Sequence, residues 1–157
     1  MPFVYTLKRY KDPIVTPHQV ALVQHSFESV KPIADTAATL FYDRLFAVAP
    51  EYRRMFTGDM QRQGRMLMNM IATAVNGLSR PDTIVPAVKE LGRRHAGYGV
   101  AEKDYQVVGG ALLWTLERGL GVAFTAEVKE AWAAAYGLLA GVMQEGAREG
   151  VTLRAAA

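Results

Sequence analysis

Apolar side chains recur every three to four residues along most of the chain, and this period is that of an α-helix. Strict alternation of apolar and polar residues, which indicates half-buried strands, is nearly absent beyond the first few residues. The helices predicted from this pattern cover about residues 17–30, 32–48, 60–78, 81–97, 102–121 and 125–148. We therefore predict one all-α domain of six main helices over residues 16–150, with an irregular extension at 1–15 and a short tail at 151–157.

The first helix has a clear start signal. Thr16 is suited to the N-cap, Pro17 to the first helical position, and Gln19 to the returning half of a capping box. The apolar stripes of the first three helices are expected to bury Val20, Val23 and Phe27, then Ala37, Leu40, Phe41, Leu45 and Val48, then Gln63, Leu67, Met70, Ile71, Ala74 and Leu78.

Composition excludes several classes of site. The chain has 157 residues and no cysteine, which excludes disulfides, iron–sulfur clusters, cysteine zinc sites and thiol nucleophiles. The net charge is only +3, from 18 basic and 15 acidic side chains, and no basic run is long enough to predict a nucleic-acid partner. No apolar run approaches the roughly 20 residues of a membrane span, and the charged N-terminus does not read as a secretion signal. We expect a cytoplasmic protein.

His95 ends an apolar stripe within "VKELGRRHAGYGV", where it follows Val88 and Leu91 on the same helix face. A neutral imidazole in an apolar wall is a good iron or zinc ligand. Only this one candidate ligand lies in the region, which disfavours zinc but suits a metal already held by a macrocycle. The alternative is a core histidine hydrogen-bonded to a backbone carbonyl.

Tyr42 and Gln63 also place polar groups on apolar stripes. A buried hydroxyl or amide without a partner costs about 1–3 kcal/mol, so each needs one. The two side chains either bond to one another or to backbone, or they reach a cavity where a small polar ligand is the partner. Tyr105, just inside the next helix after His95, is placed either to orient the imidazole or simply to pack.

Three segments together resemble a known family. They are "ADTAATLFYDRLFAVAPEYRRMF", "LGRRHAGYGVAEKDYQVVGGALLWTLERGLG" and "EAWAAAYGLLAGVM". The chain resembles the bacterial single-domain haemoglobins and the globin domain of the flavohaemoglobins, over about residues 16–143. The resemblance implies a globin fold around a haem pocket, with haem b (iron protoporphyrin IX) as the cofactor.

On the side of the haem where gases bind, the resemblance implies roles for four residues. Tyr42 matches the distal tyrosine that donates a hydrogen bond to the gas ligand, and Gln63 and Leu67 match the distal glutamine and leucine. Phe56 matches the phenylalanine that packs flat on the haem.

On the other side, His95 matches the proximal histidine that binds iron. Tyr105 matches the tyrosine beside that histidine, and Arg94 matches a basic residue near the propionates. Val108, on the apolar face of the 102–121 helix, is counted with the haem-lining residues.

Two departures from the family bear on activity. Ala147 stands where flavohaemoglobins have a glutamate beside the proximal tyrosine and histidine, and Glu145 and Glu149 lie on another helix face. This argues against peroxidase-like chemistry and against fast dioxygenase chemistry. The flavin and nicotinamide reductase domain has no counterpart in these 157 residues, so we expect a separate flavin reductase to supply electrons for any turnover.

Three functions are left open by these observations. The first is reversible binding of oxygen, NO or CO by a monomer or homodimer. The second is nitric oxide dioxygenation with an external reductase. The third is a haem-free helical interaction module in which His95 is buried and inert.

Overall fold

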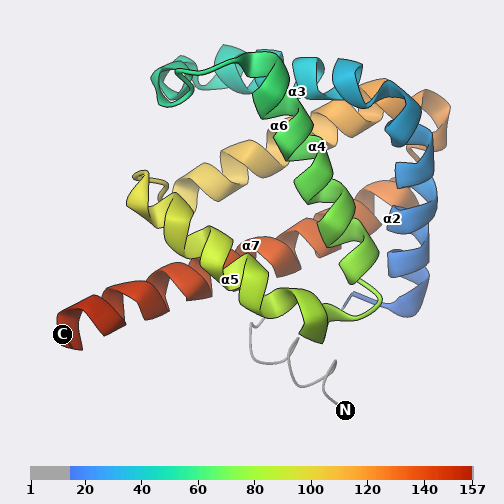
Figure 1. Ribbon diagram of the computed structural model, residues 1–157. Coiled ribbons are helices and arrows are strands. Elements are labelled where there is room, and N and C mark those ends of the chain that lie inside the picture. The colour runs from blue at the N-terminus through green and yellow to red at the C-terminus, as the bar shows by residue number, and fades with distance from the viewer. Residues whose placement is uncertain (1–14, 157) are drawn as a thin grey trace.

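Six main α-helices connected by short turns make up the part of the chain, residues 15–156, that the computed structural model describes (Figure 1). The α-helices are α2 (Pro17–Val30), α3 (Ala34–Val48), α4 (Met60–Gly77), α5 (Pro81–Gly97), α6 (Glu102–Leu120) and α7 (Ala126–Ala156). The 3-10 turns are η1 (Lys31–Ile33), η2 (Pro50–Met55) and η3 (Gly121–Ala123). The predicted all-α class is confirmed, while nearly all of the predicted extension at 1–15 lies outside the described residues.

The predicted start of α2 is confirmed in detail. The Thr16 hydroxyl accepts a hydrogen bond from the Gln19 backbone N–H, and the Gln19 side chain accepts one from the Thr16 N–H, both at 3.1 Å. These two bonds satisfy donors that a helix start otherwise leaves unpaired. Asp59 does the same for α4, since its carboxylate accepts from the Gln61 N–H at 2.9 Å.

The main hydrophobic core joins α2, α4, α6 and α7. Val23 and Ala131 are fully buried in it, and the indole N–H of Trp132 donates to the Ser26 hydroxyl at 2.9 Å. A second cluster lies between α3, η2, α4 and α6. In addition, α5 packs along α7, and α3 packs on both α4 and α6 (Figure 1). The second cluster and α5 carry all but two of the predicted site residues, Gln63 and Tyr105.

Three expectations about the elements were wrong. Val48 was expected to face inward but is 49% exposed, because α3 ends there and the chain turns at Ala49 into η2. Met70 is 38% exposed, since the buried face of α4 passes instead through Gly64, Val75 and the following Leu78. The last helix was expected to end near Arg148, but α7 continues to Ala156. No proline interrupts it.

Candidate functional site

The second cluster, here called the Tyr42 cluster, brings four of the predicted site residues together. Its buried members are Phe41, Tyr42, Leu45 and Ala111, and packed against them are Phe46, Tyr52, Phe56, Met60, Leu67, Val107, Val108 and Leu112. The cluster thus includes the predicted residues Tyr42, Phe56, Leu67 and Val108, from η2 and three different helices. Residues distant in sequence therefore form a single apolar wall around one tyrosine.

Aromatic neighbours hold the Tyr42 ring. Phe41 meets it edge-on with 5.1 Å between ring centroids, and Phe56, the residue after η2, does so with 5.3 Å between ring centroids. Phe46 lies 5.9 Å away on the next turn of α3. Edge-to-face pairs of this kind contribute about 0.5–1.5 kcal/mol each beyond the area they bury. The ring is 6% exposed and has little freedom to turn away.

The hydroxyl of Tyr42 is where the apolar cluster becomes polar. The Gln63 side-chain amide donates a hydrogen bond to this oxygen at 3.1 Å. Because the tyrosine oxygen is the acceptor, its own proton remains available for another partner. Burial raises the pKa of Tyr42 above its ordinary value, although the Gln63 bond lowers it somewhat. Tyr42 is therefore a neutral, oriented donor at physiological pH.

His95 lies near the end of α5 and is half-buried. Its Nδ1 is 2.8 Å from the carbonyl oxygen of Leu91, four residues earlier. A carbonyl only accepts, so Nδ1 carries a proton, and in the neutral imidazole the lone pair is then on Nε2. A backbone or carboxylate partner on one ring nitrogen is the usual way in which a protein orients the other nitrogen toward a metal.

The other two predicted residues near His95 have different surroundings. Arg94 is exposed beside it at the end of α5. Tyr105 is 9% exposed on α6, and its backbone carbonyl accepts a 2.5 Å hydrogen bond from the hydroxyl of Tyr136 on α7. Within residues 15–156, the structure contains no hydrogen bond between Tyr105 and His95, so the Leu91 carbonyl is the group that orients the imidazole.

Two carboxylates in the second half of α7, Glu145 and Glu149, are directed to a lysine. Lys89 Nζ lies 2.9 Å from Glu149 and 3.7 Å from Glu145. Lys89 precedes His95 by six residues, which is about 9 Å along the helix axis. Both glutamates thus pair with α5 at Lys89 and not at His95. This arrangement is consistent with the expectation that they lie on a different face of α7 from Ala147.

Sequence reasoning missed one contact that closes an edge of the Tyr42 cluster. The hydroxyl of Tyr52, on η2, donates to the carboxylate of Asp104 at the start of α6. Burial and the negative Asp104 raise the pKa of Tyr52 to about 12, and the bond lowers the pKa of Asp104. The only sequence signal was an aromatic residue in the turn after Pro50, which does not specify a partner 52 residues away.

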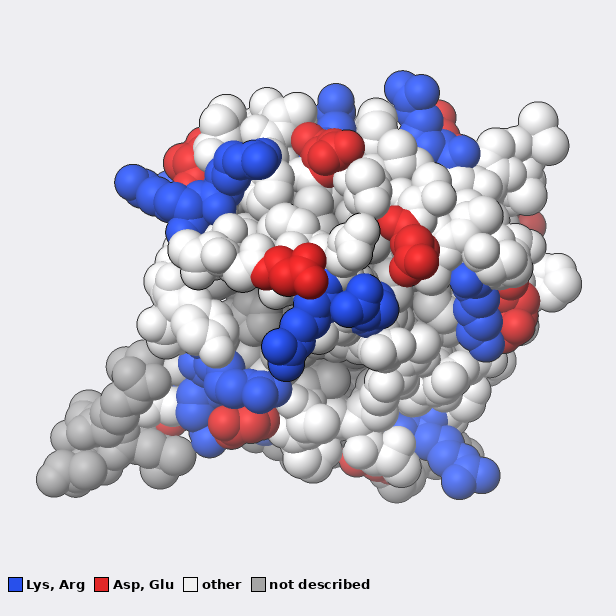
Figure 2. Space-filling model, turned by 45° about the horizontal axis from the view of Figure 1, so that its top comes forward, with Lys and Arg blue, Asp and Glu red and all other residues white. Residues whose placement is uncertain are grey.

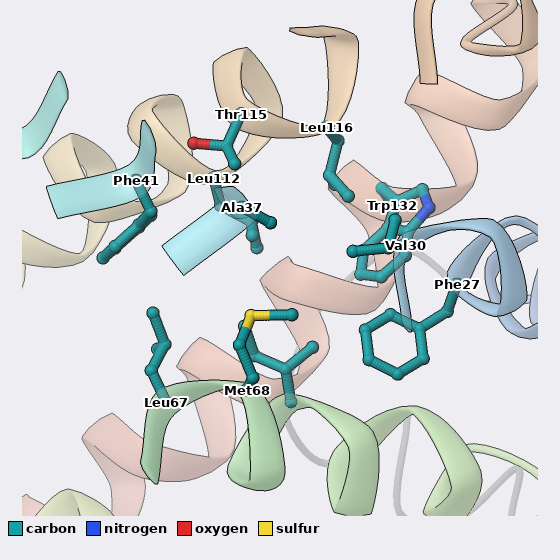
Figure 3. A pocket seen from close by; sticks show the side chains of 11 residues that line it. Phe27, Val30, Ala37, Phe41, Leu67, Met68, Leu112, Thr115, Leu116 and Trp132 are labelled. Atoms are coloured by element: carbon teal, nitrogen blue, oxygen red, sulfur yellow. The ribbon is translucent and has the colours of Figure 1, made fainter. Parts of the chain in front are cut away.

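A small cavity of about 20 Å³ adjoins the Tyr42 cluster. In Figure 3, Leu67 and Met68 reach up from α4 toward Leu116 of α6, with Phe41 at one end and Phe27 near the other. Its remaining lining residues are Val30, Ala37, Ile71, Leu112, Thr115 and Trp132. The Thr115 hydroxyl donates to the carbonyl of Ala111 at 2.8 Å. The cavity is thus an apolar space with room for about one water-sized molecule. Leu67 lines both this cavity and the Tyr42 cluster.

Charge is dispersed on the face shown in Figure 2, where Lys and Arg side chains stand in separate groups among Asp and Glu. Some arginines pack on aromatic rings: Arg44 and Arg118 lie 5.1 and 4.7 Å from the centre of Trp114.

Among the described residues, no helix is both long and apolar enough to cross a membrane. In the same part of the chain, no three His, Asp or Glu side chains are grouped to hold a metal ion.

Comparisons with known proteins agree on one family. The Globin family model matches residues 39–143. A flavohemoprotein of Bordetella parapertussis is 31% identical over 133 residues, which are 83% of this chain and 33% of that protein. A flavohemoprotein of Bacillus subtilis is 29% identical over 124 residues, 77% of this chain and 31% of that protein. This chain therefore spans about a third of the length of these relatives.

A solved structure is similar throughout. It is an engineered carbene transferase made from a candidate nitric oxide dioxygenase of Rhodothermus marinus. The TM-score is 0.80 at 22% identity, and the match covers 90% of this chain and 99% of that one. At this identity the likeness shows the shared fold.

Proposed function

Because the chain belongs to the globin family and is related to the globin domains of flavohemoproteins, we propose that it holds haem b through His95 and binds oxygen reversibly beside Tyr42. The predicted globin fold is confirmed by the family match together with the structural likeness. Membership of this family implies a haem group and small gas ligands.

The donor set of the chain fits a haem. His95 offers one neutral nitrogen, Nε2, which is the single ligand that a metal in a macrocycle requires. Phe56, Leu67 and Val108 supply apolar contacts for the ring from the Tyr42 cluster, and the exposed Arg94 is suited to a propionate. The chain has no cysteine, so a thioether-linked haem is excluded and haem b is the type proposed.

When bound, ferrous haem supplies an iron that takes up diatomic gases and shifts negative charge onto them. Tyr42 then provides what the iron does not, a fixed hydrogen-bond donor. The observation that carries the proposal is the direction of the Gln63–Tyr42 bond, since the amide donates to the phenol and leaves the phenol proton for the ligand. A hydrogen bond to a charge-bearing acceptor is worth about 1.5–3 kcal/mol, which predicts slow oxygen release.

The surroundings of His95 support reversible binding over peroxidase-like chemistry. A carboxylate bonded to Nδ1 would make the imidazole a stronger electron donor, whereas a neutral backbone carbonyl does so weakly. Here Nδ1 faces the Leu91 carbonyl, and Glu145 and Glu149 pair with Lys89. We place the protein with gas binders rather than with enzymes that cleave the O–O bond.

Nitric oxide dioxygenation is the second candidate, supported by the Tyr42–Gln63 pair and by the flavohemoprotein relatives. This reaction would convert NO, dioxygen and one electron to nitrate. We propose that a flavin reductase outside these 157 residues supplies this electron. Many NO molecules consumed per haem, with NADH and a reductase present, would favour this function; a single stoichiometric reaction would leave reversible binding.

Haem ligation is tested by absorption spectra of the ferric, ferrous and CO-bound protein. The parent should be red with an intense band near the violet edge, and His95→Ala should lose or weakly retain haem. His25→Ala is the matched control because His25 is exposed on α2, and it should retain haem fully. A folded, reconstituted parent without haem absorption would instead support the haem-free interaction module.

A further inference from the structure

The helix that carries His95 touches α7 backbone to backbone. A Cβ added at Gly92 on α5 would lie 1.9 Å from the carbonyl oxygen of Met143, and one at Gly146 on α7 would lie 2.1 Å from the carbonyl oxygen of Lys89. Ordinary contacts of a Cβ begin at 3.4 Å. Each glycine costs its helix about 0.5–1 kcal/mol relative to alanine, so close approach is what the two glycines contribute.

Side chains of α5 also contact α7 on both sides of Gly92. Lys89, one turn before it, pairs with Glu149 and Glu145, and the Lys89 and Glu145 side chains are only 17% and 16% exposed. Arg93 directly follows Gly92, and its side chain packs against Gly150. A Cβ added at Gly150 would lie 2.9 Å from Cγ of Arg93. A half-buried ion pair of this kind is a weak source of stability, but it holds the register in which the two helices meet.

The crossing lies next to the groups that orient the imidazole. Gly92 follows Leu91, whose carbonyl holds His95 Nδ1, and it precedes His95 by three residues, or about 4.5 Å of helix. Any side chain at Gly92 or Gly146 would have to move this turn of α5 away from α7 by more than about 1 Å, because the interior is close-packed.

We propose that Gly92 and Gly146 are positioning residues which, through the α5–α7 contact, set the depth of His95 relative to the haem. The inference rests on the proposed ligation by His95. The contact holds the proximal nitrogen at a fixed distance from the Tyr42 cluster, and so tunes the strength of the iron–histidine bond. A misplacement of about 1 Å in a site of this kind is enough to change a rate by up to about 100-fold.

The test is the iron–histidine stretching band of the ferrous, gas-free holoprotein in resonance Raman spectra. Gly146→Ala should shift this band and change the CO association rate by about tenfold. Gly137→Ala is the matched control on the same helix, because no atom lies within 4 Å of a Cβ there, and both values should stay as in the parent.

Lys89→Met is the second variant, because it removes the ion pairs with Glu145 and Glu149 without adding volume at the helix crossing. It should shift the iron–histidine band even if Gly146→Ala does not fold. Folded, haem-loaded Gly146→Ala or Lys89→Met protein with the parent's band would overturn the inference and leave His95 ligation intact. A haem-loaded parent that lacks any iron–histidine band would instead refute the proposed ligation.

Discussion

Replacing Tyr42 by phenylalanine removes one oxygen from the proposed gas-binding side and little else. The hydroxyl is the group on this ring that Gln63 contacts, while the ring packs against Phe41, Phe46 and Phe56. Phenylalanine can keep those ring contacts. We therefore expect Tyr42→Phe to change gas kinetics with little change in the melting temperature.

The magnitude follows from the bond that is lost and the bond that replaces it. The phenol proton contributes about 1.5–3 kcal/mol toward a charge-bearing ligand. Without the phenol oxygen, the Gln63 amide loses its acceptor and is free to donate to the ligand, which recovers about 0.5–1.5 kcal/mol. Taken at the middle of both ranges, the net loss is about 1.2 kcal/mol, so oxygen should dissociate about 8-fold faster.

Stopped-flow displacement of oxygen by CO measures this rate directly. Gln63→Leu should have a smaller effect than Tyr42→Phe, because it leaves the phenol donor in place but frees it to rotate. The double variant should show the full loss, about 10- to 150-fold. A dissociation rate in Tyr42→Phe within twofold of the parent, with haem fully bound, would refute the role assigned to the tyrosine.

Three further outcomes are expected. Since burial raises the pKa of Tyr42, it stays protonated, and oxygen dissociation should be constant between about pH 6 and 9; a change with an apparent pKa in that range would contradict a neutral donor. Tyr52→Phe should lower the unfolding free energy at pH 7 by about 0.5–1 kcal/mol, a value kept small by solvent. The difference in unfolding free energy between Tyr52→Phe and the parent should vanish in acid, as pH falls through the lowered pKa of Asp104. It should also vanish in base, as pH rises from 10.0 toward the Tyr52 pKa of about 12. Chemical denaturation across pH measures this, and an unchanged difference at pH 3 would refute the pairing. Leu116→Ala should cost about 2–5 kcal/mol in the same assay, because the side chain is 4% exposed and its loss enlarges an existing cavity; a cost below about 1 kcal/mol would show that the core collapses to fill it.

Features that depend on neighbours along the chain could be predicted from the sequence. Helical periodicity predicted all six main helices, and the Thr16 capping box is formed as expected because its groups lie three residues apart. The same periodicity identified His95, Tyr42 and Gln63 as polar side chains on apolar stripes. It predicted that they needed partners but left the partners open.

Contacts between groups on different helices could not be predicted in this way, because they depend on how the helices pack. Gln63 bonds to Tyr42 across 21 residues, Tyr52 reaches Asp104 across 52, and Lys89 reaches Glu149 across 60. Helix packing fixes these distances, and periodicity carries no information about which turn of one helix lies against which turn of another. For the same reason, two glycines that weaken isolated helices become, in the folded protein, the contact that brings α5 onto α7.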